Sequence, residues 1–340
     1  MGVNLTELLS KKIISLDDLK NKRIAVDASI FLYQFLTTIR QRDGTPLMDS
    51  KNRVTSHLSG LFSRNCNLIK NGLKLIYVFY GEPPKLKEEE HEKRKKNKEE
   101  AKAKYEIAKK KKDIAEMKKF AARTTKLTKD MVEDAKSLIE AFGLPIVQAP
   151  SEGEAQAAYL VKQNEAYAVA SQDADSLLFG SPNLIRNLSV SGKKKRIKKE
   201  VYETITPELI SLTETLEKLQ INQDQLIVLG MLVGTDYNVG GIKGIGKKSA
   251  LKLVKKYKDF EELFKDVKWN NYFNVDWKDI FNLFKKMPVN KDYSLKFNQI
   301  NKEKIIKILV DEHDFSLERV EKQLNELLEE KKQKGLGEWF

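Results

Sequence analysis

Short apolar runs alternate with longer segments of helical spacing through the first two thirds of this chain. Each run has four or five residues, as in strands that are buried on both faces of a sheet. The runs lie at residues 23–26, 75–79, 146–149, 166–170 and 184–188. The helical segments between them lie at residues 30–40, 54–70, 130–142 and 154–162. This alternation predicts an α/β fold, in which a mostly parallel central sheet is flanked by helices.

Six carboxylates follow apolar runs in the sequence. They are Asp27, Glu152, Glu154, Asp173, Asp175 and Asp236. In an open α/β sheet the carboxyl ends of the parallel strands face one crevice, where ligands bind. We therefore expect these side chains to lie together. Carboxylates gathered in this way repel one another unless a cation lies between them.

Each of these residues also has a simpler interpretation as part of a helix start. Ser151 and Glu154 have the spacing of a capping box, so Glu152 and Glu154 could both belong to an ordinary helix N-terminus. Asp27 could be the N-cap of the helix that follows it, and Asp173 could cap residues 174–179. The alternative stays open for each residue taken singly. Several segment ends that all close on acidic residues favour a shared site.

A cluster of carboxylates is the kind of site that catalyses phosphodiester hydrolysis, because it can bind the metal ions that the reaction uses. The reaction needs a hydroxide near neutral pH and charge relief on the leaving oxygen, and two Mg²⁺ ions about 3.5–4 Å apart supply both. Mg²⁺ prefers oxygen ligands, which carboxylates provide. With 3 histidines and a single cysteine, Cys66, the chain has little material for a zinc site.

The charge of the chain indicates what the cluster acts on. A net charge of +13 predicts a polyanionic partner, with nucleic acid as the first candidate. Residues 85–119 hold 15 Lys and Arg against 9 Asp and Glu, so they are either a solvated helical excursion or disordered. Residues 192–199 read as a basic hairpin tip. No apolar run approaches the roughly 20 residues that cross a membrane, and the single cysteine suits an intracellular protein.

Several long motifs resemble the flap endonucleases, the structure-specific 5′ nucleases of replication. They are Val-Asp-Ala-Ser-Ile-Phe-Leu-Tyr at residues 26–33, Ala-Pro-Ser-Glu-Gly-Glu-Ala at 149–155, Ser-Gln-Asp-Ala-Asp-Ser at 171–176 and Gly-Thr-Asp-Tyr-Asn at 234–238. The resemblance covers essentially the whole chain, and its spacing looks archaeal. It implies that the six carboxylates bind two Mg²⁺ ions, for which Mn²⁺ could substitute.

One position departs from the family pattern. The family has Phe-Asp-Gly after the second strand, whereas this chain has Phe79, Tyr80 and Gly81. A phenol with a pKa near ~10 is a poor Mg²⁺ ligand. The change is natural with activity kept, natural with activity weakened, or engineered. We expect reduced or altered metal binding, because removal of a ligand from a two-metal site raises the reaction barrier.

The resemblance also implies roles for the basic segment and for residues near it. Residues 85–120 would form a helical arch, and the single-stranded 5′ flap would pass beneath it. Lys87 and Arg94 would contact the scissile phosphate, and a helical repeat of 3.6 residues puts both on one face. Tyr33 would stack a base beside the cut, with core packing as the alternative. Arg40 and Arg64 would contact DNA, with an exposed helix charge as the alternative.

A glycine-rich stretch precedes the predicted helix at residues 247–257. Glycines let backbone N–H groups approach a phosphate, and the N-terminus of a following helix favours anions. The resemblance implies a helix–two-turn–helix element that holds the DNA duplex, with K⁺ as a further candidate ligand. Gly234, Gly244 and Gly246 are the expected DNA contacts. An ordinary turn between two helices is the alternative.

The end of the chain matches the sliding-clamp-binding box of the family. The match consists of Gln333, Leu336, Trp339 and Phe340. At this spacing the apolar side chains would line one face of a short helical turn and enter a hydrophobic pocket of the clamp. Aromatic side chains on a polar tail have no core to join, which favours a partner.

These observations predict five regions: an N-terminal nuclease region at 1–98, the arch at 85–120, an internal nuclease region at 121–258, a C-terminal helical region at 259–325 and the tail at 326–340. The expected protein is a monomeric, Mg²⁺-dependent 5′ flap endonuclease and 5′-3′ exonuclease, which acts on flap or nicked duplex DNA and binds no membrane. It would be cytoplasmic in an archaeon and nuclear in a eukaryote. The alternatives are a catalytically weakened flap- and clamp-binding protein, which Tyr80 supports, and a basic RNA-binding protein, which the carboxylates oppose.

Overall fold

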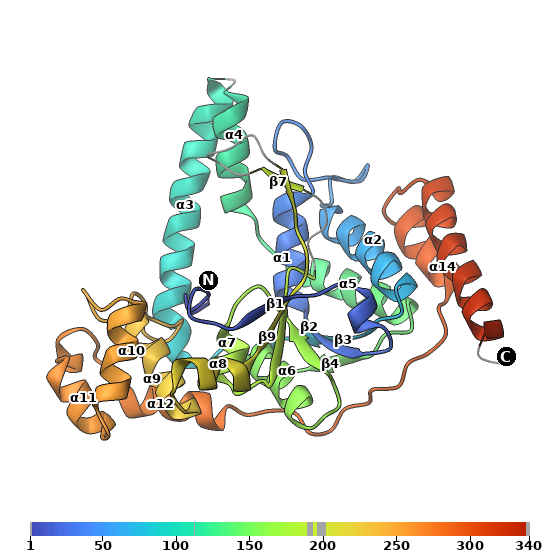
Figure 1. Ribbon diagram of the computed structural model, residues 1–340. Helices are drawn as coiled ribbons and strands as arrows, with labels where there is room; N and C mark the ends of the chain where they lie inside the picture. The colour runs from blue at the N-terminus through green and yellow to red at the C-terminus, as the bar shows by residue number, and fades with distance from the viewer. Residues whose placement is uncertain (1, 112, 189–192, 196–201, 338–340) are drawn as a thin grey trace.

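A sheet of seven strands, in the order β1-β9-β6-β5-β2-β3-β4, forms the centre of the protein (Figure 1). The computed structural model describes residues 2–111, 113–188, 193–195 and 202–337. The five parallel strands are β2 (Arg23–Asp27), β3 (Lys74–Phe79), β4 (Ile146–Gln148), β5 (Ala168–Ala170) and β6 (Asn183–Arg186). Two antiparallel strands, β1 (Lys11–Ile13) and β9 (Glu208–Ser211), extend one side of the sheet. The predicted mostly parallel α/β sheet is confirmed.

Helices cover both faces of the sheet, as the apolar character of its strands requires. On β2, Ala25 belongs to one hydrophobic cluster, whereas Ile24 and Val26 belong to the other. The helices that contribute to the cluster of Ile24 include α1 (Ala28–Thr38), α2 (Ser56–Lys70) and α5 (Lys129–Ala141). Those that contribute to the cluster of Ala25 include α6 (Gly153–Lys162), α7 (Asp175–Leu178) and α9 (Gln223–Val233).

The basic segment forms two helices that stand away from the sheet. They are α3 (Glu88–Lys110) and α4 (Ile114–Ala121), which lie side by side (Figure 1). Only Glu90, Ala101 and Ala108 are buried on the described part of α3, so this helix is largely solvated. Of the two states that the sequence left open for this segment, the structure has the helical one.

The C-terminal part is mainly helical, as predicted, but it contains a long extended stretch. The helices before it are α8 (Leu212–Leu219), α10 (Lys247–Lys256), α11 (Phe260–Asp266) and α12 (Trp277–Lys286). Residues 287–300 then run without helix or strand to α13 (Lys302–Ile306) and α14 (Leu317–Gly337) (Figure 1). Backbone hydrogen bonds from Asn298 N–H to Gly143 O (2.9 Å) and from Asn301 N–H to Ala141 O (2.8 Å) hold this stretch against the C-terminal end of α5 and the loop that follows it.

Two smaller elements complete the fold. Strands β7 (Lys193–Lys195) and β8 (Tyr202–Thr204) pair antiparallel. Residues 193–195 of the predicted hairpin tip at 192–199 thus lie in a strand, and the other residues of that prediction lie outside the described residues. The two antiparallel strands β1 and β9 do not appear among the predicted strands. Within the described ranges, no helix combines the length and apolarity that a membrane crossing requires.

Candidate active site

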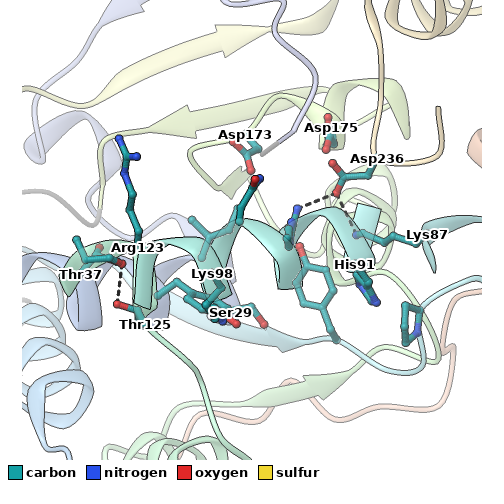
Figure 2. Close-up of a pocket in the computed structure, with 18 of the residues that line it drawn as sticks. Ser29, Thr37, Lys87, His91, Lys98, Arg123, Thr125, Asp173, Asp175 and Asp236 are labelled. Atoms are coloured by element: carbon teal, nitrogen blue, oxygen red, sulfur yellow. Dashed lines mark hydrogen bonds and ion pairs between the residues drawn. The ribbon is translucent and has the colours of Figure 1, made fainter. Parts of the chain in front are cut away.

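The six predicted carboxylates lie at the starts of helices and in turns around the carboxyl edge of the sheet. Asp27 ends β2, Glu152 and Glu154 stand at the start of α6, and Asp175 begins α7. Asp173 precedes α7, and Asp236 follows α9. Figure 2 shows Asp173, Asp175 and Asp236 close together. All except Asp27 line one cavity of about 980 Å³, which extends beneath the arch helices.

The helix-cap interpretation accounts for one carboxylate only. Asp27 Oδ1 does accept a hydrogen bond from the backbone N–H of Ile30 at 3.0 Å, so Asp27 is the N-cap of α1. The predicted capping box of Ser151 and Glu154 does not form. Glu152 is the N-cap residue of α6 without a capping side-chain bond, and Ser151 Oγ donates to Glu82 O instead. Helix capping therefore does not account for the carboxylates at the start of α6.

Burial makes this cluster electrostatically costly. Asp27 is fully buried, and Glu154 and Asp175 are less than one tenth exposed. Burial and the neighbouring carboxylates raise the pKa of Asp27 and that of Asp175 to about 7, and they raise the pKa of Glu154 well above its usual range. The negative charges thus lie close enough to oppose one another. A divalent cation bound among the oxygens would relieve this repulsion, and carboxylates suit Mg²⁺.

Two basic side chains of the arch reach into the cluster. Lys87 Nζ lies 3.0 Å from Glu152 Oε2. It also lies 3.3 Å from Asp236 Oδ2 (Figure 2). Arg94 also contacts Asp236 at 3.3 Å and pairs with Glu90. Burial opposes the charge of Lys87, but Glu152 and Asp236 together outweigh it, so the pKa of Lys87 is raised. Lys87 therefore stays a cation at the carboxylates.

Tyr80 occupies the position where the family pattern has a carboxylate. Its hydroxyl donates a hydrogen bond to Asp27 Oδ2 at 2.9 Å. Its ring lies against the start of α6, where a Cβ added to Gly153 would come within 2.7 Å of ring carbons. Burial, followed by the charges of Asp27 and Glu154, raises the pKa of Tyr80 well above its usual value. Tyr80 is thus a neutral donor in the site, where a carboxylate would be an acceptor.

The comparisons with known proteins agree with this architecture. The XPG N-terminal domain model matches residues 1–101, and the XPG I-region model matches residues 143–236. Flap endonuclease 1 of Pyrococcus abyssi is 52% identical, over 100% of this chain and 98% of the relative. That of Staphylothermus marinus is 49% identical over 100% of both chains.

The chain belongs to the flap endonuclease family.

Solved structures extend the match to three dimensions. The flap endonuclease-1 structure from Methanococcus jannaschii has a TM-score of 0.76 and 44% identity, over 98% of this chain and 100% of that one. The catalytic core of Rad2 in complex with DNA substrate has a TM-score of 0.70 at 23% identity, over 96% of this chain and 100% of that one. At this lower identity the second match supports the fold alone.

In this flap endonuclease fold, one of three residues predicted to contact DNA lines the cavity beneath the arch, and the other two do not. Tyr33 on α1 lines the cavity beneath the arch and is 41% exposed, so core packing does not account for it. Arg40 and Arg64 lie outside that cavity. Arg40 donates to Gly44 O at 2.8 Å and to Thr125 Oγ1 at 2.5 Å, so it joins two loops. Arg64 is half-buried on α2, which does not fit a freely exposed helix charge.

The glycine-rich turn joins α9 and α10, which gives the helix–turn–helix arrangement expected in the family. Gly234 has φ +112°, and a Cβ there would lie 2.6 Å from the backbone nitrogen of Gly241, so the turn closes tightly on itself. By contrast, a Cβ on Gly244 or Gly246 would meet nothing within 4 Å. Gly246 is also the N-cap residue of α10. The backbone at these two glycines is therefore open to an approaching phosphate.

The N-terminal segment contributes to the site and was not predicted. The backbone N–H of Val3 donates to Asp175 Oδ1 at 2.6 Å. A Cβ on Gly2 would lie 2.6 Å from Asp175 Oδ2 and 2.6 Å from Asp173 Cβ. Gly2 therefore has to lack a side chain for the segment to approach these carboxylates. This is a contact between distant parts of the chain, and no spacing in the sequence indicates it.

The predicted clamp-binding tail is described in part. The backbone of Gln333 and Leu336 belongs to α14. Trp339 and Phe340 lie outside the described residues. The sliding-clamp match therefore stays a prediction from the sequence.

Proposed function

We propose that this protein is a structure-specific 5′ flap endonuclease and 5′-3′ exonuclease that cuts DNA at junctions of single and double strands. The observation that carries the proposal is the convergence of buried carboxylates beneath a basic arch. The relatives named flap endonuclease 1 favour DNA as the substrate. Monomeric action on flap or nicked duplexes during replication and repair is part of the proposal.

The carboxylates are the proposed holders of two divalent cations, Mg²⁺ by preference and Mn²⁺ as a substitute. The proposed ligands are Asp27, Glu152, Glu154, Asp173, Asp175 and Asp236. Their donor atoms are all oxygens, and burial raises the repulsion among them, which Lys87 and Arg94 relieve only at Glu152 and Asp236, so this donor set suits such ions. The chemistry that two such ions supply is a hydroxide near neutral pH and charge relief on the leaving oxygen.

The arch residues have a separate task in this proposal. Lys87 and Arg94 line the cavity together with the carboxylates, and their donors can turn towards a phosphate between arch and sheet. There they would stabilise the negative charge that develops as the phosphodiester breaks. Tyr33, exposed in the same cavity, would stack a base next to that phosphate.

Duplex binding is assigned to the turn between α9 and α10, with Arg40 and Arg64 as further DNA contacts. The open backbone at Gly244 and Gly246 suits a phosphate, and such contacts position a duplex without reading its sequence. K⁺ is the candidate ion at this turn. The tail with Gln333, Leu336, Trp339 and Phe340 would bind the sliding clamp.

A cleavage assay tests the proposal. A DNA duplex with a labelled 5′ flap should be cut near the junction in Mg²⁺ or Mn²⁺ and should stay intact in EDTA. Asp175→Asn should remove cutting, whereas Lys93→Met, at an exposed position outside the cavity, should keep it.

The second candidate function is a flap-binding protein with weakened catalysis. The hydrogen bond of Tyr80 to Asp27 favours it, because a phenol stands in place of an expected ligand. Tight flap binding without cleavage in either metal would support this candidate against the nuclease.

A further inference from the structure

Lys87 forms ion pairs with two carboxylates of the cluster. Its Nζ lies 3.1 and 3.0 Å from the two carboxylate oxygens of Glu152 and 3.3 Å from Asp236 Oδ2. The side chain is 11% exposed, and those of its partners are 3% and 12% exposed. Glu152 begins α6, and Asp236 follows α9, so the ammonium group joins two distant parts of the chain. Lys87 is therefore built into the cluster.

The ammonium group lies where a metal ion would need the same oxygens. A divalent cation and an ammonium cannot share two carboxylates at contact distance, because the two positive charges repel strongly in a buried site. Across the described part of the chain, no three acidic, histidine or cysteine side chains stand ready around a single point to hold a metal ion. Instead, the ammonium group of Lys87 contacts the carboxylates of Glu152 and Asp236.

We propose that Lys87 is the resident counter-ion of the cluster and sets its affinity for divalent cations, which have to displace its ammonium group from Glu152 and Asp236. This rests on the proposed function, in which these carboxylates hold metal. Because the Lys87-bound arrangement is not competent for metal, its population reduces the apparent metal affinity. Displacement would also turn the same ammonium group towards a phosphate in the cavity.

The contact connects the metal site to the arch. Lys87 immediately precedes α3, and Arg94, two turns further along, contacts Asp236 as well. Both contacts hold the base of α3 against the carboxylates. Metal binding that releases Lys87 should therefore loosen the first turns of α3, before any DNA is present.

Metal titration of the full chain without DNA tests the affinity claim. Mn²⁺ binding is measured by calorimetry and by electron paramagnetic resonance for the unsubstituted protein, Lys87→Met, Lys87→Arg and Lys93→Met. Lys87→Met should bind Mn²⁺ about tenfold more tightly, since the competing state is removed. Lys87→Arg should stay close to the unsubstituted protein. Lys93→Met removes the same charge from an exposed position on α3 and should change little, which excludes a long-range charge effect.

The outcomes separate the two proposals. An unchanged or weaker Mn²⁺ affinity in Lys87→Met would overturn the role of Lys87 while the metal site stands. Absence of Mn²⁺ binding from all four proteins would overturn the metal site itself, and with it the proposed function.

Amide hydrogen exchange tests the connection to the arch. In the unsubstituted protein, exchange in the first turns of α3 should become faster when Mn²⁺ is added. In Lys87→Met it should already be fast without metal and should respond little. Exchange in α3 that does not depend on Mn²⁺ in the unsubstituted protein would contradict the release of Lys87.

Discussion

The hydroxyl of Tyr80 donates a hydrogen bond to Asp27 Oδ2 at 2.9 Å, while the other oxygen of Asp27 accepts from the backbone of Ile30. Both carboxylate oxygens of a proposed metal ligand are thus already engaged by the protein. The partners fix the orientation of Asp27, but they also occupy part of its capacity to bind a cation. The consequences of Tyr80 can be measured separately from catalysis.

Tyr80→Asp should change stability in opposite directions with and without metal. In EDTA the added carboxylate lies beside Asp27 and the other buried acids, so like-charge repulsion should lower the melting temperature. In Mg²⁺ the same group should act as a further ligand, which raises the melting temperature relative to EDTA and lowers the Mg²⁺ concentration for half-maximal cleavage by about tenfold. Thermal unfolding in both buffers provides the measurement, with Tyr80→Phe as the control that adds no charge. Equal shifts in EDTA and in Mg²⁺ would count against a ligand position at residue 80.

Gly2→Ala should weaken metal binding through the N-terminal segment. The added methyl would lie 2.6 Å from Asp175 Oδ2, so the segment or the carboxylate has to move. The hydrogen bond from Val3 N–H to Asp175 should be lost with it. We expect about tenfold weaker Mn²⁺ binding by calorimetry, as for loss of other groups that orient a ligand. Asn4→Ala, at an exposed position in the same segment, is the matched control. The same affinity in both variants would refute the packing argument.

His57 should make the protein less stable as the pH falls. The ring is fully buried on α2, and among the described residues neither ring nitrogen has a hydrogen-bond partner. Burial, followed by the nearby charge of His313, lowers the pKa of His57 to about 3. Between pH ~6.5 and that value, the unfolded chain binds a proton at this residue and the folded protein does not. The free energy of unfolding therefore decreases as the pH is lowered. The contribution of His57 to the slope of the unfolding free energy against pH approaches about 1.4 kcal/mol per pH unit.

Denaturant unfolding at several pH values measures this contribution. In His57→Leu, the free energy of unfolding should depend less steeply on pH between pH 6 and 4. The reason is that unfolding of this variant takes up about one proton fewer. His91→Leu, at an exposed position on α3, should leave the slope as it is. Parallel curves for the unsubstituted protein and His57→Leu would show that His57 titrates normally.

Removal of residues 333–340 should separate clamp stimulation from cleavage. The deleted residues include Gln333, Leu336, Trp339 and Phe340, whereas the carboxylate site lies on the sheet edge and in the turns beside it. Basal flap cleavage should persist, and stimulation by the clamp should disappear. Loss of both activities together would contradict the division between tail and nuclease.

The sequence predicts the parallel strands well because their burial determines their composition. On β2, side chains enter the hydrophobic cores of both sheet faces, so the run from Ile24 to Val26 has to be continuously apolar. The edge strand β1 carries Lys11 and Lys12, and its side chains are exposed. It therefore lacks the apolar run by which a buried strand is predicted. The extended stretch 287–300 depends on hydrogen bonds to distant backbone, such as that from Asn298 to Gly143, and no local pattern encodes them.

The same distinction holds for the candidate site. Residues such as Asp27 and Asp175 stand at strand or helix ends, where a general property of α/β sheets brings ligands together. The local capping rule is wrong for Ser151, because Glu82 O offers its hydroxyl a partner from another part of the chain. The approach of Gly2 to Asp175 and the hydrogen bonds from Lys87 to Glu152 are tertiary contacts, which no local sequence pattern indicates.

Anomalous diffraction from a crystal soaked in Mn²⁺ tests most directly whether distant carboxylates gather divalent cations. Two peaks about 3.5–4 Å apart are predicted among Asp27, Glu152, Glu154, Asp173, Asp175 and Asp236. Soaked crystals with no peak within ligand distance of these side chains would contradict the account.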